Sequence, residues 1–241
     1  MGSQSGVFID KEFRAPSPNA GKLSLQANFA DLALTLDHSG ALYIAAHQTL
    51  LVSDLHLEKG SGAAALGRLL PALDSRDTIL RLKRAIETYR PARVICLGDS
   101  FHDTLAGERM AAEDKEDLSS LCASVCEWIW IGGNHDPEVP AFCGGKTFSE
   151  EEIGGVVLRH EPRAGWQGAQ IAGHLHPKVS VSAGHYRFSG RCFCVWPDLL
   201  IVPAFGAFAG GLSCSGPAIR QLRKLEPKLI MVHASKLWRV S

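Results

Sequence analysis

The sequence carries no excess charge of either sign, because Lys and Arg together number 25 and Asp and Glu together also number 25. Proteins that attract nucleic acid through their overall field are strongly basic, so this balance excludes that mode of binding. Aromatic residues make up only 7% of the chain, which leaves few rings for stacking on unpaired bases. Any contact with nucleic acid must therefore come from local positive charge or from bound metal ions.

The sequence also lacks a signal-peptide pattern, and it has no uninterrupted apolar stretch long enough to span a bilayer. Its seven cysteines are an odd number in a chain of 241 residues, which is not typical of a secreted disulfide framework. We therefore expect a protein of the reducing cytoplasm. Cys192 and Cys194 alternate along a strand-like run with both thiols on one face, and we interpret them as packing residues rather than a metal site.

The glycine patterns of Walker and Rossmann nucleotide-binding loops are absent as well. The segment at residues 60–67 is rich in Gly and Ala, and its small side chains predict a mobile loop instead of a phosphate cradle.

With 46% hydrophobic residues, the chain can bury a full core, and this length is typical of one domain. We place a single domain at residues 29–241. Residues 1–28 are rich in Gly, Ser, Pro and Asn without periodicity, so they are interpreted as a poorly ordered N-terminal arm. Neither an internal repeat nor a linker divides the rest of the sequence.

The order of predicted elements indicates a layered α/β fold. Apolar residues recur at helical spacing over residues 79–86, and Asp74 before them and Pro91 after them mark the ends of a helix. A second helix is expected over residues 111–126, which begin with acidic side chains. The most clearly predicted strands are Thr49–Val52, Arg93–Leu97, 128–131, Ala169–Ala172, 199–202 and 230–233.

Polar motifs follow four of these β-prone runs, and a lone histidine, His160, follows a further apolar run at residues 156–158. A sheet that aligns the strand ends gathers the motifs at one edge, where they supply seven donors: Asp54, His56, Asp99, Asn134, His160, His174 and His176. Oxygen and imidazole donors without a thiolate suit Mn, Fe or Zn in an open site better than a closed structural zinc site. Seven donors fit two neighbouring divalent ions if one carboxylate bridges them, and Asp99 is the natural bridge.

The order D-x-H, GD, GNHD, lone His and GHxH resembles the calcineurin-like metallophosphoesterase superfamily, over residues 42–208. The resemblance implies a β-sandwich flanked by helices in four αββα layers. It implies a first ion held by Asp54, His56, Asp99 and His176, and a second held by Asp99, Asn134, His160 and His174. It further implies that His135 stabilises charge at the phosphate and protonates the leaving oxygen, while Asp136 orients the ring of His135.

The residues around the motifs are similar to one subfamily, the bacterial ligase-associated DNA-damage-response endonucleases. This similarity implies an endonuclease that hydrolyses DNA phosphodiesters in DNA repair, beside a DNA ligase and a helicase. Among metals, Mn is expected first, with Fe or Zn as alternatives. One departure concerns the superfamily spacing GD-x-x-D, which here is GD-x-x-x-D. His102 replaces the second acid and Asp103 follows it, so neither inherits a role from the resemblance.

Three classes of function remain open from the sequence: a DNA phosphodiesterase, a phosphoesterase for small molecules such as nucleotides, and a non-catalytic scaffold. The scaffold is disfavoured because Asn134, His135 and both histidines of GHxH are intact. The neutral net charge keeps the small-molecule enzyme open. Candidate cations for contacting substrate phosphates are Lys59, Arg76, Arg163, Lys178 and Arg191.

Overall fold

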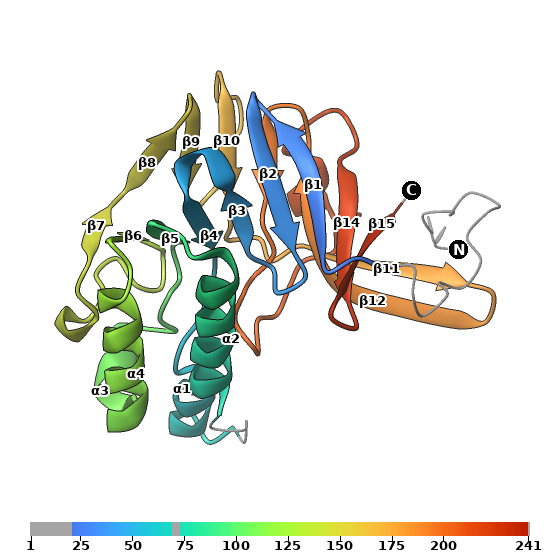
Figure 1. The fold of residues 1–241 in the computed structure, drawn as a ribbon. Coiled ribbons are helices and arrows are strands. Elements are labelled where there is room, and N and C mark those ends of the chain that lie inside the picture. Colours follow the sequence, from blue (N-terminus) through green and yellow to red (C-terminus); the bar gives the residue numbers. More distant parts are fainter. Residues whose placement is uncertain (1–20, 69–72, 241) are drawn as a thin grey trace.

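The computed structural model describes residues 21–68 and 73–240, which form two facing β-sheets with helices packed beside the first (Figure 1). The first sheet has seven strands in sequence order. Their bounds are Ser24–Phe29 (β1), Leu32–Asp37 (β2), Leu42–Ile44 (β3), Thr49–Val52 (β4), Arg93–Leu97 (β5), Glu127–Ile131 (β6) and Lys146–Phe148 (β7).

The second sheet has eight strands and follows the order β15-β14-β12-β13-β10-β9-β8, with β11 paired to β12. Their bounds are Glu150–Ile153 (β8), Val156–Arg159 (β9), Ala169–Ala172 (β10), Lys178–Ala183 (β11), Tyr186–Val195 (β12), Leu199–Ile201 (β13), Lys228–His233 (β14) and Lys236–Val240 (β15). Strands β9, β10 and β13 run parallel, whereas the other pairings are antiparallel.

Parallel pairing of β4, β5, β6 and β7 places the ends of these strands at one edge of the first sheet. Such pairing requires crossover connections, which here contain the helices Lys59–Ala65 (α1), Asp74–Tyr89 (α2), Ala106–Arg109 (α3) and Ala112–Ala123 (α4). All four residues of β4 are buried, as expected for a strand covered on both faces. Helix α2 ends where Arg90 turns left-handed before Pro91, which confirms the end predicted from proline.

Three apolar clusters hold the layers together. The cluster between the sheets includes Leu36 and Phe193, and the cluster between the first sheet and the helices includes Leu82 and Trp130. A third covers the outer face of the second sheet, where Ile219 of the short helix α5 (Pro217–Arg220) packs. The arrangement confirms the predicted β-sandwich flanked by helices.

Two sequence-based boundaries differ from the structure. Residues 24–28 belong to β1, although the sequence indicated a poorly ordered arm over 1–28; Leu25 and Phe29 bury alternate side chains of this strand against the sheet core. Of that arm, residues 1–20 lie outside the described part of the chain. The start of the predicted domain therefore moves from residue 29 to before Ser24.

The segment expected to be a mobile loop contains the helix α1 instead. Its small residues allow close packing, because a Cβ on Gly62 would lie only 2.7 Å from the His102 ring. The backbone N–H of Gly60 donates to Asp74 Oδ2 at 2.9 Å, which fixes α1 against the start of α2. Among the described residues, no helix combines the length and apolarity needed to cross a membrane.

Candidate metal centre

The motifs predicted to bind metal lie where strands of both sheets end. The first sheet supplies donors after β4, β5 and β6, and the second supplies donors after β9 and β10. We use "metal centre" for these seven residues: Asp54, His56, Asp99, Asn134, His160, His174 and His176. The structure thus brings together side chains from five separate loops.

Five of the seven residues adopt a left-handed backbone: φ is 54° at Asp54, 44° at His56, 46° at Asp99, 66° at His174 and 44° at His176. A residue with a Cβ pays roughly 1–2 kcal/mol for this conformation, and such strain concentrates at functional sites. Backbone hydrogen bonds hold the strained loops, since Asp54 N donates to Gly98 O at 3.1 Å and His56 N donates to Asp99 O at 2.9 Å.

One donor group combines Asp54, His56, Asp99 and His176, whose ligand atoms all lie within 4.8 Å of one another. His176 Nε2 lies 3.1 Å from both Asp54 Oδ1 and His56 Nε2. His56 Nε2 in turn lies 3.9 Å from Asp99 Oδ2. These nitrogen and oxygen lone pairs converge on one small volume that a cation can fill.

A second donor group combines Asp99, His160 and His174 under the same 4.8 Å limit. His160 Nε2 lies 3.3 Å from Asp99 Oδ1, 3.1 Å from His174 Nδ1 and 3.0 Å from Asn134 Oδ1. The amide oxygen of Asn134 therefore joins this group. Asp99 belongs to both groups and presents Oδ1 to His160 and Oδ2 to His56.

Outer contacts orient the donors, and the sequence analysis assigned no role to these. His160 Nδ1 donates to the Leu97 carbonyl at 2.8 Å, which leaves its Nε2 facing the donor group. The Ser53 hydroxyl donates to Asp54 Oδ2 at 2.5 Å, and His174 N donates to the same oxygen at 3.0 Å. Hydrogen bonds of this kind fix the tautomer and direction of metal ligands. The sequence signal that could have identified Ser53 is its position directly before the D-x-H motif.

Glycines in the motifs provide the space for this convergence. A Cβ on Gly173 would collide with the Ser53 hydroxyl and would lie 2.6 Å from Asp54 Oδ2. A Cβ on Gly98, where φ is +81°, would collide with the His160 ring. Only glycine allows both the close approach and the positive φ. The glycines of GD and GHxH therefore bring the two sheets' loops into contact.

Burial and nearby charges shift the pKa values of the donors in different directions. Burial lowers the pKa of His56 to about 4, so its imidazole is neutral and keeps a lone pair. Burial alone would lower the pKa of His160, but its hydrogen bond to Asp99 and the charges of Asp54 and Asp99 raise it to about 9. Burial would raise the pKa of Asp99, yet the contacts with His160 bring it below its usual range. The carboxylate stays ionised.

The donor chemistry fits divalent cations. Two buried carboxylates, one amide oxygen and four imidazoles lie at contact distance, and oxygen with imidazole is the ligand type of Mn, Fe and Zn sites.

His135 lies beside the donors and faces outward. Its side chain is 44% exposed, and its Nε2 lies 3.9 Å from Asp99 Oδ2. The His135 backbone N–H donates to Asp99 Oδ1 at 3.0 Å, which ties the loop to the shared carboxylate. Its ring stacks on His102 with centroids 5.8 Å apart. An imidazole in this position can reach a phosphate ester placed over the metal centre.

The structure does not support an orienting role for Asp136. Its carboxylate is buried and accepts a hydrogen bond from Phe101 N at 2.9 Å, and it makes no hydrogen bond to the His135 ring. The carboxylate points inward beneath Gly133, where a Cβ added to the glycine would lie only 2.7 Å from Asp136 Oδ1. Burial raises the pKa of Asp136 to about 7. Asp136 therefore holds the loop after β5 through its hydrogen bond with Phe101 N. The His135 ring stacks on His102.

The unusual GD-x-x-x-D spacing places His102 and Asp103 in two different environments. His102 stacks on His135 at the edge of the metal centre, whereas Asp103 turns away and accepts a hydrogen bond from Arg109 Nη2 at 2.7 Å.

Two of the candidate cations are paired with carboxylates, since Arg76 pairs with Asp114 and Arg163 pairs with Glu150. Lys59 has no carboxylate partner among the residues that the structure describes.

A β-sandwich that gathers carboxylates, imidazoles and an amide at its strand ends, next to an exposed histidine, defines a metal-dependent hydrolase. Comparison with known protein families identifies which family of hydrolases this is. The model of the calcineurin-like phosphoesterases matches residues 47–227, more than half of the chain, so the protein belongs to this family. Members bind divalent metal ions and hydrolyse phosphate esters, and the protein is a metal-dependent phosphoester hydrolase.

Solved structures give a more specific relative. The nuclease MPE of Pseudomonas putida is 26% identical, has a TM-score of 0.72, and aligns over 90% of this chain and 100% of its own. The E. coli phosphoesterase Yfce aligns over 77% of this chain and 88% of its own, with 15% identity and a TM-score of 0.39. A comparison with curated proteins found no match.

Proposed function

We propose that the protein is a dinuclear, Mn-dependent phosphodiesterase that cleaves DNA. The observation that carries this proposal is the sharing of Asp99 between the two donor groups, with the exposed His135 ring 3.9 Å from the same carboxylate. The proposed ligands are Asp54, His56, Asp99 and His176 for one ion and Asp99, Asn134, His160 and His174 for the other. When bound, the ions would neutralise phosphate charge and supply an acidified water.

The residues of the chain supply the rest of the chemistry. His135 Nε2 donates a proton to the leaving oxygen, because it is the exposed imidazole closest to the shared carboxylate. His102, stacked on His135, limits the directions in which that ring can turn. Lys59 follows the D-x-H loop at the start of α1 and offers an ammonium to a neighbouring phosphate. A diester needs this acid most, because its alkoxide is a poor leaving group.

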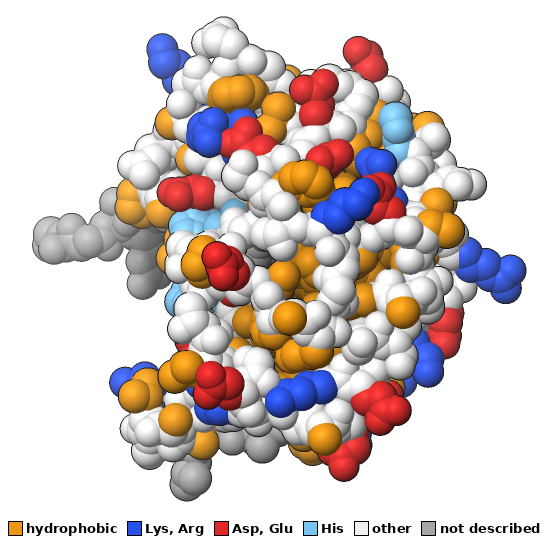
Figure 2. Space-filling model, turned by 90° about the vertical axis from the view of Figure 1, so that its left-hand side faces the viewer, with side chains coloured by type: hydrophobic (Ala, Val, Ile, Leu, Met, Phe, Trp, Pro, Cys, Tyr) orange, Lys and Arg blue, Asp and Glu red, His pale blue; other side chains and the backbone are white. Residues whose placement is uncertain are grey.

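DNA as the substrate is supported by the likeness to the Pseudomonas putida nuclease over nearly the whole chain. Hydrolysis of internal diester bonds in DNA repair is proposed from the subfamily resemblance of the motifs. Figure 2 shows basic and acidic side chains interspersed on one face of the molecule, in keeping with the neutral net charge. Binding is therefore proposed to depend on the metal centre and a few nearby cations, with a shallow salt dependence.

The proposal also covers the cellular compartment and the partner proteins. All seven cysteines are free thiols, which fits a reducing cytoplasm. Cooperation with a DNA ligase and a helicase is proposed from the subfamily resemblance. A small phosphate ester is the alternative substrate, favoured by the balanced charge of the chain.

The test compares substrates at one enzyme concentration with Mn supplied: an aryl monoester, an aryl diester, and labelled single-stranded and duplex DNA. The proposal predicts cleavage of the diester and of at least one DNA form, both faster than hydrolysis of the monoester. Rapid monoester turnover with inert diester and DNA would place the protein among small-molecule phosphatases. Replacing Mn with Fe or Zn in the same reactions identifies the metal that supports turnover best.

A further inference from the structure

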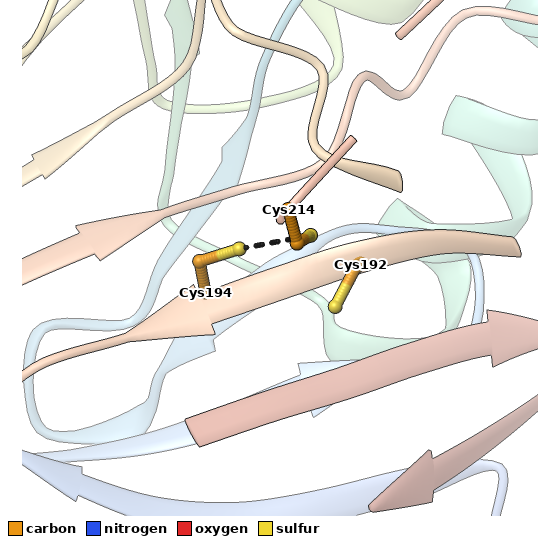
Figure 3. Close-up of side chains that lie close together, drawn as sticks. All are labelled: Cys192, Cys194 and Cys214. Carbon is orange, nitrogen blue, oxygen red and sulfur yellow. Dashed lines mark hydrogen bonds between the residues drawn. The ribbon is translucent and has the colours of Figure 1, made fainter. Parts of the chain in front are cut away.

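Three cysteines outside the metal centre form a second, chemically different group. Figure 3 shows Cys192 and Cys194 projecting from one side of strand β12, and Cys214 pointing to Cys194 from a separate segment. The three sulfur atoms all lie within 4.8 Å of one another, and Cys194 Sγ lies 3.4 Å from Cys214 Sγ. We call Cys192, Cys194 and Cys214 the thiol cluster. We propose that it binds one soft, thiophilic metal ion of the Zn²⁺ and Cd²⁺ class.

The sulfur spacing matches such an ion. Thiolates at about 2.3 Å from a zinc ion lie roughly 4 Å from one another, close to the spacing within the cluster. Among the described residues, no His, Asp or Glu belongs to this group, so its donors are sulfur alone. Sulfur donors select soft ions, whereas the oxygen and imidazole donors of the metal centre suit Mn. The chain therefore separates two kinds of ion by ligand chemistry.

Packing alone does not require this arrangement. Cys96, Cys122 and Cys143 are also buried in an apolar cluster, yet they form no comparably tight ligand group within the described chain. Hydrogen bonding from the two neighbouring thiols lowers the pKa of Cys214, whereas burial raises the pKa of Cys192 and the hydrogen bond with Cys214 raises that of Cys194. Binding of the ion would release the thiol protons to solvent.

The segment that carries Cys214 lies next to solvent. Cys214 is buried, but the side chains of Ser213 and Ser215 on either side are exposed. The same segment touches the loop of the metal centre, since Leu212 N donates to Leu175 O at 3.4 Å. It also pairs with the start of β11, where Lys178 N donates to Leu212 O and Cys214 N donates to Lys178 O, both at 2.8 Å. A bound ion would therefore fasten the segment behind His174 and His176 to strand β12.

The test titrates the reduced, full-length protein with Cd²⁺ after saturating it with Mn²⁺, and follows the near-ultraviolet charge-transfer absorption of cadmium thiolates. This signal is specific for sulfur, so it does not depend on the metal centre or on the proposed nuclease activity. We expect saturation at one Cd²⁺ per chain, displacement by Zn²⁺, and no displacement by further Mn²⁺. An absent band, or displacement by Mn²⁺, would overturn the proposal.

Cysteine variants locate the signal. Cys194→Ser and Cys214→Ser should weaken Cd²⁺ binding at least about a hundredfold, because even outer partners of metal ligands contribute 10- to 100-fold. Cys126→Ser is the control, since Cys126 is an exposed thiol outside the cluster. Cys214 lies on a loop, so its variant gives a folded test if Cys194→Ser is unstable in a thermal melt. Wild-type Cd²⁺ affinity in the folded Cys214→Ser protein would contradict the assignment.

Discussion

The metal centre and the thiol cluster meet at residues 172–178, yet the chain builds them in opposite ways. Ala172 packs into the apolar cluster around the thiols, and two residues later His174 belongs to the metal centre. The metal centre uses left-handed loops and buried carboxylates, with the exposed His135 beside it. The thiol cluster uses a regular strand, β12, and apolar neighbours. Both sets of donors converge, but of the two sites only the metal centre has donors with a left-handed backbone.

This difference shows that conformational strain is concentrated at the metal centre. Aligning five loops at strand ends requires positive φ at five non-glycine residues and close contacts at Gly98 and Gly173. Cations that bind the folded state and not the unfolded chain can offset that strain, since binding energy adds to folding energy. The thiol cluster needs no such compensation, because Cys192 and Cys194 reach one face by strand alternation alone.

The largest effect is expected from Asp99→Asn, which alters the carboxylate that both donor groups share. Turnover should fall to background and the protein should lose both ions, while Cd²⁺ binding by the thiol cluster persists. Elemental analysis and diester hydrolysis measure the two outcomes. Asp117→Asn, on the exposed side of α4, is the matched control and should behave as wild type. If Asp99→Asn kept two ions and full activity, Asp99 would not be the bridge.

A smaller loss is expected from His135→Ala, which separates chemistry from coordination. Removing the proposed acid should reduce turnover of a diester by roughly 10²–10⁴-fold with the metal content unchanged. His185→Ala removes an exposed histidine that belongs to neither donor group, and should leave turnover intact. Loss of both ions in His135→Ala would make His135 a ligand and disprove the assigned role.

The smallest effect on turnover is expected from Gly173→Ala, which tests whether close backbone approach shapes the metal centre. The added methyl group meets the Ser53 hydroxyl and Asp54, so His174 must shift; a displacement near 1 Å can cost about a hundredfold in rate. Gly210→Ala is the control, because a Cβ there has open space. Equal kinetics for the two alanine variants would show that Gly173 is not needed for alignment.

The sequence predicted the parts of the fold that depend on local pattern. Continuous apolar runs gave β4, β5 and β10 with their bounds, and helical spacing with Pro91 gave α2. The motifs also indicated that the seven donors gather at one edge, because each motif directly follows a strand whose end is fixed by the sheet; their division into two groups came from the family resemblance and stays a prediction.

Features that depend on tertiary contact were beyond prediction. Residues 59–65 contain several glycines and alanines, which favour a loop by composition, but packing on α2 makes them helical. The direction of the Asp136 carboxylate is set by Phe101 N, 35 residues away in the chain. Cys214 joins Cys192 and Cys194 only through folding, so no spacing rule revealed the third thiol.

The central claim is that two ions share the Asp99 carboxylate. Electron paramagnetic resonance of the Mn-reconstituted protein tests it most directly, because Mn²⁺ ions joined by a bridge couple their spins. At full loading we predict the spectrum of an exchange-coupled pair in the wild-type protein and its loss in Asp99→Asn. A fully loaded wild-type protein that shows only the hyperfine pattern of isolated Mn²⁺ would contradict the account.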